Sequence, residues 1–336
     1  MQGQKYQSIQ FLRAVAALMV VIYHSKSAFG PEDRAHLAWL PGVSDNGALG
    51  VSLFFVISGF IIANTLDRPS IDFGDFAWRR VMRIYPLYWI VMLAGLATFL
   101  WRGWYAADWE AMGIWGMLAS FLILPQEPFP FWNPGWSLEH ELIFYLIAGL
   151  VVPKLGLRVL CAVMVSLGVI GFWVHFWDYH LFKDAQFYFG AGVGAYLCRN
   201  ASLKFSAVVA LVLLAAAYAH LYGFLEYSVA MRSLAFAFGF GALIVMFLGL
   251  ERHGWKVPRS TVAIGDASYS LYLWHWLLLP FTGLAYWVYG GTPELWRWVF
   301  VASSVLVALV SYQLIEKPIN NWAHRVRRRA VVQPAE

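Results

Sequence analysis

The chain is a succession of long apolar stretches separated by short polar ones. A helix needs about 17–25 predominantly apolar residues to cross a hydrocarbon layer of about 30 Å. Ten stretches are predicted as spans: 9–27, 47–66, 84–100, 136–152, 157–176, 185–197, 205–223, 229–250, 268–289 and 295–315. The shorter stretch 111–124, bounded by Pro125, is predicted to be re-entrant or interfacial. The pattern predicts an all-α membrane protein, a polytopic bundle of about ten transmembrane helices.

Composition and charge support this prediction. Of the 336 residues, 60% are hydrophobic and only 13% are charged, which is far from soluble norms. With the N-terminus inside and ten crossings, 18 of the 24 lysines and arginines face the cytoplasm, as the positive-inside rule requires. We therefore predict that both termini are cytoplasmic. The domains expected are a transmembrane domain, 1–320, and a basic cytoplasmic tail, 321–336, that meets anionic lipid headgroups. Nucleic acid is not an expected partner.

Two ionisable residues interrupt the first predicted span. Arg13 and His24 lie eleven residues apart, so on a helix they project from one face, about 16 Å apart along the axis. An ionisable side chain inside a span is costly unless it faces protein or water, and this predicts a functional site. The alternative is that Arg13 extends to the inner interface and His24 hydrogen-bonds a neighbouring helix.

Three arginines precede the third predicted span, in the predicted cytoplasmic loop 67–83. Arg79 and Arg83 are four residues apart and share a helical face, with Arg80 beside them. Guanidinium groups bind phosphate through planar, bidentate hydrogen bonds, and Arg13 could contribute to the same cluster. The arginines therefore predict a phosphate site, with positive-inside anchoring as the alternative.

A second polar group lies in NPGWSLEHELIFY, residues 133–145, where the chain turns into the fourth predicted span. Ser137 is predicted to cap this helix, and Glu139 in its first turns suits the helix dipole. Glu141 lies deeper, with Tyr145 one turn beyond it on the same face. Both Glu141 and His24 are expected toward the outer side, so the two can meet at similar depth.

A histidine beside a carboxylate is a general-base pair, in which the carboxylate orients the imidazole and stabilises its protonated form. Phosphate capture inside and proton abstraction outside would suit transfer of an activated group across a bilayer. Ser268 and His275 are seven residues apart and lie near one helical face; packing of the bundle through a hydrogen bond is the alternative reading of His275. No pair of histidines has metal-ligand spacing with a supporting acid, and no metal is predicted.

Six motifs in order resemble the acyltransferase 3 family of integral membrane O-acyltransferases, over nearly the whole chain. Residues 9–24 are similar to its first-helix pattern of arginine and histidine, and residues 47–62 to its second-helix signature, which includes Ser58. WRRVMRIYPLYW, WSLEHELIFY, IGDASYSLYLWHW and IEKP resemble the later motifs. Glu141 matches the family's glutamate, and Glu139 resembles an additional acid of the exopolysaccharide-modifying branch.

The resemblance implies an acyl-CoA donor, usually acetyl-CoA, and no permanently bound cofactor. The implied acceptor is a hydroxyl of a surface polysaccharide or related glycan, including glycolipids, acylated at the outer side of a bacterial-type inner membrane. Many relatives carry an acid in the second helix where this chain has Ser52, so no role is assigned to such an acid. Some relatives carry a further esterase-like domain, and this chain is expected to act as the transmembrane core.

The sequence therefore favours a membrane-bound O-acyltransferase. His24 would deprotonate the acceptor hydroxyl and Glu141 would position it or balance its charge. The CoA phosphates would be bound by Arg13, Arg79, Arg80 and Arg83. The residues expected to support the site or the substrate are Ser58, Trp136, Ser137, Glu139, Tyr145, Ser268 and His275.

Two questions stay open at this point. Direct attack on the thioester and an acyl-histidine intermediate at His24 are both compatible with these residues. A transporter or flippase for an anionic glycan or lipid is the competing class, although the chain shows no inverted repeat. Membrane lipids are expected partners in either case, and no particular oligomeric state is predicted.

Overall fold

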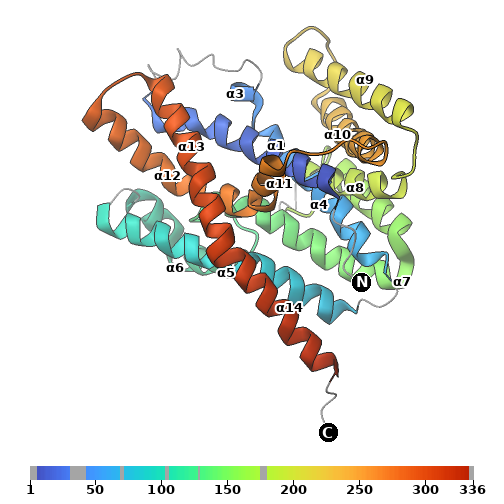
Figure 1. Ribbon diagram of the computed structural model, residues 1–336, viewed down its shortest axis with the longest axis horizontal. Coiled ribbons are helices and arrows are strands. Elements are labelled where there is room, and N and C mark those ends of the chain that lie inside the picture. The colour runs from blue at the N-terminus through green and yellow to red at the C-terminus, as the bar shows by residue number, and fades with distance from the viewer. Residues whose placement is uncertain are drawn as a thin grey trace. The chain divides into compact units, whose positions relative to one another are not determined.

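The computed structural model describes residues 6–30, 43–68, 72–102, 106–127, 129–174 and 180–332. Every regular element in these ranges is helical, which confirms the all-α class (Figure 1). The elements are α1 (Gln7–Ser25), the 3-10 turn η1 (Lys26–Ala28), α3 (Val43–Asn46), α4 (Leu49–Leu66), α5 (Phe73–Arg102), α6 (Ala106–Leu122), α7 (Gly135–Ile170), α8 (Asp184–Leu197), α9 (Leu203–Leu221), α10 (Val229–Arg252), α11 (Arg259–Asp266), α12 (Ser268–Tyr289), α13 (Pro293–Ser311), the π-helical turn η2 (Tyr312–Glu316) and α14 (Lys317–Val332).

Seven helical segments within the described ranges are long and apolar enough to cross a membrane, so this is a multi-pass membrane protein. They are Gln7–Ala28, Leu49–Leu66, Phe73–Trp101, Gly135–Ile170, Leu203–Leu221, Val229–Arg252 and Pro293–Ala323. The fourth and fifth predicted spans are the two halves of α7, which breaks at Gly156 with φ 81° and ψ 175°. The other two predicted spans outside the seven form α8, with 14 residues, and α12, with 22. The apolar part of α6, Met112–Leu122, is shorter than a crossing requires.

Contacts divide the chain into two compact units. Unit 1 comprises Met1–Arg13, Val51–Asp72 and Glu139–Gly265, and unit 2 comprises Ala14–Gly50, Phe73–Leu138 and Asp266–Glu336. In unit 1, α10 packs against both α8 and α9. In unit 2, α12 packs against α13, and α14 runs along α5 (Figure 1).

Glycines bring α4 and α8 of unit 1 into backbone contact. A Cβ atom at Gly59 would lie 2.2 Å from the Phe189 carbonyl oxygen, and one at Gly192 would lie 2.0 Å from the Val56 carbonyl oxygen. Only glycine permits this approach, which is a common way for helices to associate in membranes. The crossing holds Ser58, the neighbour of Gly59, at a fixed place in the unit.

A carboxylate from α10 holds the first turn of α1 in unit 1. Glu251 accepts hydrogen bonds from the backbone N–H groups of Gln7 and Ser8, each at 3.0 Å, and from the Ser8 hydroxyl. The first N–H groups of a helix have no partner within it. Glu251 therefore acts as a cap supplied by another helix, and its charge favours the positive end of the helix dipole.

Aromatic side chains of α5 close the end of α6 in unit 2. Tyr85 and Tyr88 donate to the carbonyls of Leu122 and Ser120, each at 2.8 Å, and Trp89 Nε1 donates to the Phe121 carbonyl at 2.9 Å. The last carbonyls of a helix lack partners within it, and three indole and phenol donors supply them here. This explains how a short apolar helix is held against a long one.

The predicted tail is partly helical. Helix α14 continues from η2 to Val332, and Trp78 Nε1 of α5 lies 3.4 Å from the Ala323 carbonyl that accepts its hydrogen bond. The predicted tail, 321–336, therefore includes most of α14, a helix that packs on α5. Its last four residues, 333–336, lie outside the described residues, as do the side chains of Arg327, Arg328 and Arg329.

Candidate active site

His24 of α1 pairs with a second histidine, His275 of α12, and both belong to unit 2. The Nδ1 atom of His24 lies 3.1 Å from Nε2 of His275, and the two rings stack with centroids 5.1 Å apart. The edge of Trp276 packs against the His24 ring with centroids 5.2 Å apart. His275 is fully buried, whereas His24 is partly exposed. The imidazole predicted to be a base is thus oriented on one side by a buried imidazole.

A buried arginine, Arg297, is hydrogen-bonded to Ser25, the residue that follows His24. Arg297 of α13 is 0% exposed, and its Nε atom donates to the Ser25 hydroxyl at 2.9 Å. Ser25 in turn donates to the Ile22 carbonyl at 2.6 Å. An arginine buried within a membrane-spanning helix is a mark of function or of a firm structural tie. It holds the end of α1 that carries His24 against α13.

The three arginines predicted in a loop lie in helix α5, which begins at Phe73. The helix begins before the predicted span 84–100 because Asp75 stabilises its first turn: Arg79 donates to Asp75 through Nε at 2.9 Å and forms an ion pair with it at 2.8 Å. The Arg80 guanidinium carbon lies 5.7 Å from the centre of the Phe76 ring. The predicted spacing does place Arg79 and Arg83 one helical turn apart on α5, with Arg80 beside Arg79.

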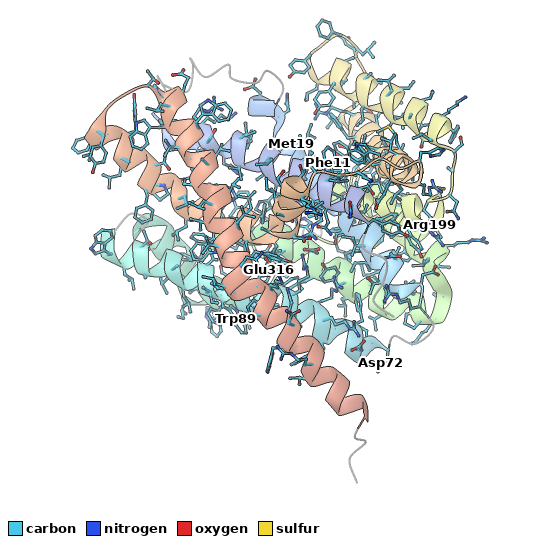
Figure 2. All side chains as sticks on the ribbon, viewed as in Figure 1. Phe11, Met19, Asp72, Trp89, Arg199 and Glu316 are labelled. Carbon is cyan, nitrogen blue, oxygen red and sulfur yellow. The ribbon has the colours of Figure 1, made fainter. Side chains whose placement is uncertain are left out.

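Arg83 faces a carboxylate that the sequence reasoning did not select. Its NH1 atom lies 3.7 Å from Oε1 of Glu316, which is 2% exposed and belongs to η2 (Figure 2). Ser270 of α12 donates to the other Glu316 oxygen at 2.8 Å. π-helical turns inside α-helical segments occur frequently at functional sites. Glu316 therefore links α5 and α12 to the end of α13.

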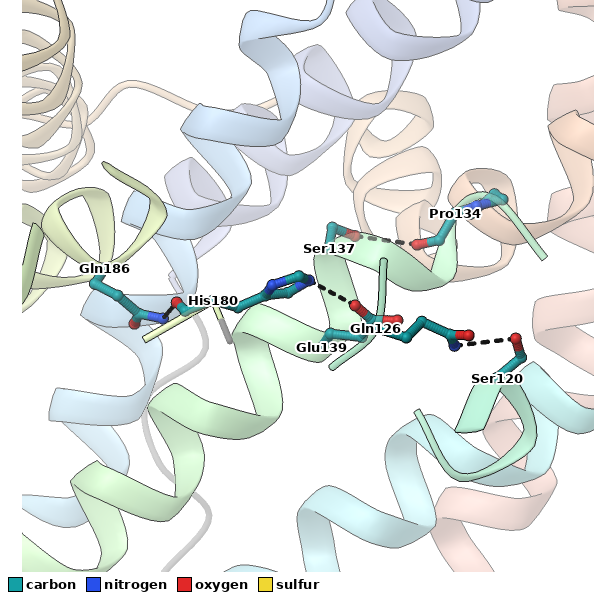
Figure 3. A network of polar contacts seen from close by, with 7 residues as sticks. All are labelled: Ser120, Gln126, Pro134, Ser137, Glu139, His180 and Gln186. Carbon is teal, nitrogen blue, oxygen red and sulfur yellow. Dashed lines mark hydrogen bonds and ion pairs between the residues drawn. The ribbon is translucent and has the colours of Figure 1, made fainter. Parts of the chain in front are cut away.

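The positions and contacts of the predicted residues at the start of α7 and α12 agree only in part with the prediction. Helix α7 begins at Gly135, so Ser137 lies within its first turn and is not the N-cap that was predicted. The Ser137 hydroxyl donates to the Pro134 carbonyl at 3.2 Å (Figure 3) and lies 2.8 Å from the Tyr272 hydroxyl. Trp136 beside it is partly exposed. Ser268 is fully buried, and its hydroxyl has no hydrogen-bond partner among the described residues.

Glu141 of α7 belongs to unit 1, where two hydroxyl groups hold its carboxylate. Its Oε1 atom accepts from the Ser58 hydroxyl of α4 at 2.7 Å and from the Tyr145 hydroxyl one turn further along α7. The structure thus adds Ser58, which was predicted separately, to Glu141 and Tyr145, which were predicted to share a helical face. Arg13, in the same unit, donates to Gln10 of its own helix at 3.3 Å.

Glu139 pairs with a histidine instead of serving only the helix dipole. Its Oε2 atom lies 2.7 Å from Nε2 of His180, and Glu139 is 0% exposed (Figure 3). His180 stacks on His140 with ring centroids 4.3 Å apart. Gln186 donates to the His180 carbonyl at 2.8 Å and so holds this residue, whose φ of 61° is unusual without glycine. The prediction for Glu139 was incomplete, because a fully buried carboxylate needs such a partner.

Comparison with known proteins places the chain in a family. The acyltransferase 3 family, described as an acyltransferase domain, matches residues 6–316. The chain belongs to this family. It is a membrane acyltransferase, as the motifs indicated. No solved structure matches it.

Three relatives illustrate the range of the family. The exopolysaccharide production protein ExoZ of Rhizobium meliloti is 28% identical over 294 residues, which are 81% of this chain and 89% of ExoZ. An O-acetyl transferase of Shigella phage Sf6 is 29% identical over 211 residues, 55% of this chain and 61% of the phage protein. Peptidoglycan O-acetyltransferase OatA of Listeria monocytogenes is 26% identical over an alignment that covers 94% of this chain and 56% of OatA.

The candidate residues of the acyltransferase therefore form local groups within each unit. Unit 2 holds the His24–His275 pair and the arginines of α5, and unit 1 holds Glu141 with its two hydroxyl donors. The pairing of His24 with Glu141, and of Arg13 with the other arginines, would join the two units and stays a prediction. No group of three or more His, Cys, Asp or Glu side chains within the described ranges could hold a metal ion.

Sequence signals for the missed residues differ in strength. Glu316 lies in the IEKP motif directly after an apolar run, and an acid at that place is a usable signal. Arg297 lies near the start of the last predicted span, where a basic residue is common, so its position along the chain does not indicate its burial. His180 lies 41 residues from Glu139, and no spacing along the chain indicates that pair.

Proposed function

We propose that this acyltransferase transfers an acyl group, with acetyl as first choice, from cytoplasmic acyl-CoA to a hydroxyl of a surface polysaccharide or related glycan. The acceptor would be modified at the outer side of a bacterial-type inner membrane. The names of ExoZ and OatA, which refer to exopolysaccharide and to peptidoglycan O-acetylation, support a carbohydrate acceptor. The proposal includes ten crossings with both termini in the cytoplasm, which the distribution of basic residues supports.

The observation that carries the proposal is the pairing of His24 with another histidine inside a membrane helix. An imidazole is the side chain best suited to take up and release a proton near neutral pH. A histidine that served only to pack helices would not need a second ionisable ring at hydrogen-bond distance, 3.1 Å away. The family to which the chain belongs requires such a base, because a sugar hydroxyl is a weak nucleophile until it loses its proton.

The proposed reaction is a direct transfer of the acyl group from the thioester to the acceptor hydroxyl. His24 takes the proton of the acceptor hydroxyl while the hydroxyl oxygen forms a bond to the acyl carbon of the thioester. The carbon–sulfur bond breaks, and the CoA thiolate leaves and receives the proton from the His24 imidazolium. The products are an ester and CoA with a free thiol, and His24 returns to its neutral form. In this proposal Glu141 balances the charge of the imidazolium.

The arginines of α5 are proposed to bind the phosphates of CoA, together with Arg13. Arg79 already has a carboxylate partner in Asp75, and Arg83 lies 3.7 Å from Glu316. Such partners orient guanidinium groups and limit their motion, and each group offers further N–H donors for a phosphate. Arg79 lies closer to its carboxylate partner, at 2.8 Å, than Arg83 does, so donor affinity is proposed to depend most on Arg80 and Arg83.

The test uses acetyl-CoA labelled in the acetyl group and membranes of cells that express the wild type, His24→Ala or His253→Ala. His253 is the control, because its Nδ1 atom lies 2.8 Å from a carbonyl of its own helix, that of Gly249, far along the chain from the proposed base. We expect base-labile label in surface polysaccharide with the wild type and with His253→Ala, and none with His24→Ala. Normal labelling by a folded His24→Ala protein would exclude the proposed base. Movement of unmodified glycan without labelling would favour a transporter.

A further inference from the structure

The hydrogen bonds around His24 indicate which of its two nitrogen atoms reacts. We infer that His275 holds His24 in the tautomer with the proton on Nδ1, so that Nε2 carries the lone pair that accepts the substrate proton. His275 is thus a positioning residue. This inference rests on the proposed function, because it assigns an atom and a tautomer to the base proposed there.

The far side of the His275 ring faces a backbone carbonyl. Its Nδ1 atom lies 3.2 Å from the carbonyl oxygen of Leu271, one turn earlier in α12. A carbonyl oxygen can only accept a hydrogen bond, so Nδ1 of His275 carries a proton. A neutral imidazole has one N–H group, which leaves Nε2 of His275 as an acceptor.

The charged form of His275 does not fit its surroundings. The residue is 0% exposed, and the hydrogen bonds that its ring makes within the described part of the chain go to Leu271 and His24. A buried imidazolium without a carboxylate partner would be costly. His275 is therefore neutral in the resting protein.

The acceptor on His275 determines the proton on His24. Nε2 of His275 lies 3.1 Å from Nδ1 of His24, and a hydrogen bond there requires that Nδ1 carry the proton. Nε2 of His24 is then the free base. A partner that fixes the tautomer of a catalytic histidine is a known requirement of acid–base catalysis.

The same arrangement has a consequence once His24 is protonated. The imidazolium has N–H groups on both nitrogens, and the Nδ1–H bond to His275 becomes a charge-assisted hydrogen bond. His275 therefore favours the protonated form of His24 that arises during transfer, without changing its own protonation. The proton collected by Nε2 is the proton that leaves with the CoA thiol.

Two substitutions of His275 separate positioning from packing. His275→Phe keeps a ring of similar size and removes the acceptor, whereas the amide oxygen of His275→Gln can take the place of Nε2. We expect kcat of His275→Phe to fall by at least about tenfold, up to the about 10²- to 10⁴-fold that a general base contributes, with the KM for acetyl-CoA unchanged. We expect His275→Gln to recover most of that loss. Equal kcat values for the wild type and His275→Phe would overturn the positioning role.

Nitrogen NMR of protein with ¹⁵N-labelled histidine rings provides a readout apart from activity. In the wild type, at a pH where the pair is neutral, we expect His24 to show a protonated Nδ1 and an unprotonated Nε2. In His275→Phe we expect a mixture of the two tautomers. A proton on Nε2 of His24 in the wild type would overturn the assignment. If His24→Ala retained full transfer, the proposed function would fail instead, so the two failures are distinguishable.

Discussion

The hydrogen bond between Ser58 and Glu141 can be removed with almost no change in volume, by Ser58→Ala. The bond is 2.7 Å long, and its acceptor atom also receives the Tyr145 hydroxyl. A hydrogen bond to a charged group contributes about 1.5–3 kcal/mol. Ser58 and Glu141 are both partly exposed, so we expect the lower part of that range, about 1.5–2 kcal/mol. Glu141 would keep one hydroxyl donor and gain freedom to rotate.

If the orientation of Glu141 matters in the transition state, the free energy of the lost hydrogen bond is added to the activation free energy of transfer. We expect kcat/KM for acetyl transfer to fall about 10- to 30-fold in Ser58→Ala. The assay is the initial rate of transfer by purified protein in detergent micelles, with thermal unfolding measured in parallel. Thr65→Val is the matched control on the same helix, since the Thr65 hydroxyl donates to the Ile61 carbonyl of α4 itself, at 2.8 Å.

A double-mutant cycle shows whether Ser58 acts through Glu141. In a Glu141→Gln background, we expect Ser58→Ala to lower kcat/KM by less than about threefold, because the charged acceptor is already gone. The reasoning is refuted if Ser58→Ala and Thr65→Val have the same kcat/KM. It is also refuted if the effects of Ser58→Ala and Glu141→Gln are fully additive.

Three further predictions test other parts of the structure. Charge reversal at Arg80 or Arg83 should raise the KM for acetyl-CoA about tenfold or more, while the exposed Arg259→Glu should not; an unchanged KM would leave the two arginines as topology signals. Glu316→Gln should destabilise the protein by about 1–2 kcal/mol in thermal unfolding, because the ion pair with Arg83 is lost. The loss stays small because the partly exposed Arg83 can turn to solvent. Glu251→Ala should cost about 1–2 kcal/mol through the lost cap of α1, and a stability equal to that of the wild type would disprove the cap.

Local patterns along the chain determined the class of this protein. The length of the apolar stretches indicated membrane helices, and the order of the motifs indicated the acyltransferase family. The close packing at Gly59 and Gly192 became evident only from the placed helices. The helix boundaries depended on short-range contacts. The salt bridge between Asp75 and Arg79 extended α5 over a predicted loop, and the turn before Gly135 moved the start of α7 ahead of Ser137.

The sequence by itself determined an all-helical membrane acyltransferase and the residues of its motifs, because hydropathy and motif order depend on neighbours along the chain. Only the tertiary structure decided which side chains meet. His24 and His275 are 251 residues apart, and Ser58 and Glu141 are 83 apart. Such pairs depend on the rotation of each helix about its axis and on the crossing points of the helices, which glycine contacts and buried hydrogen bonds set between distant segments.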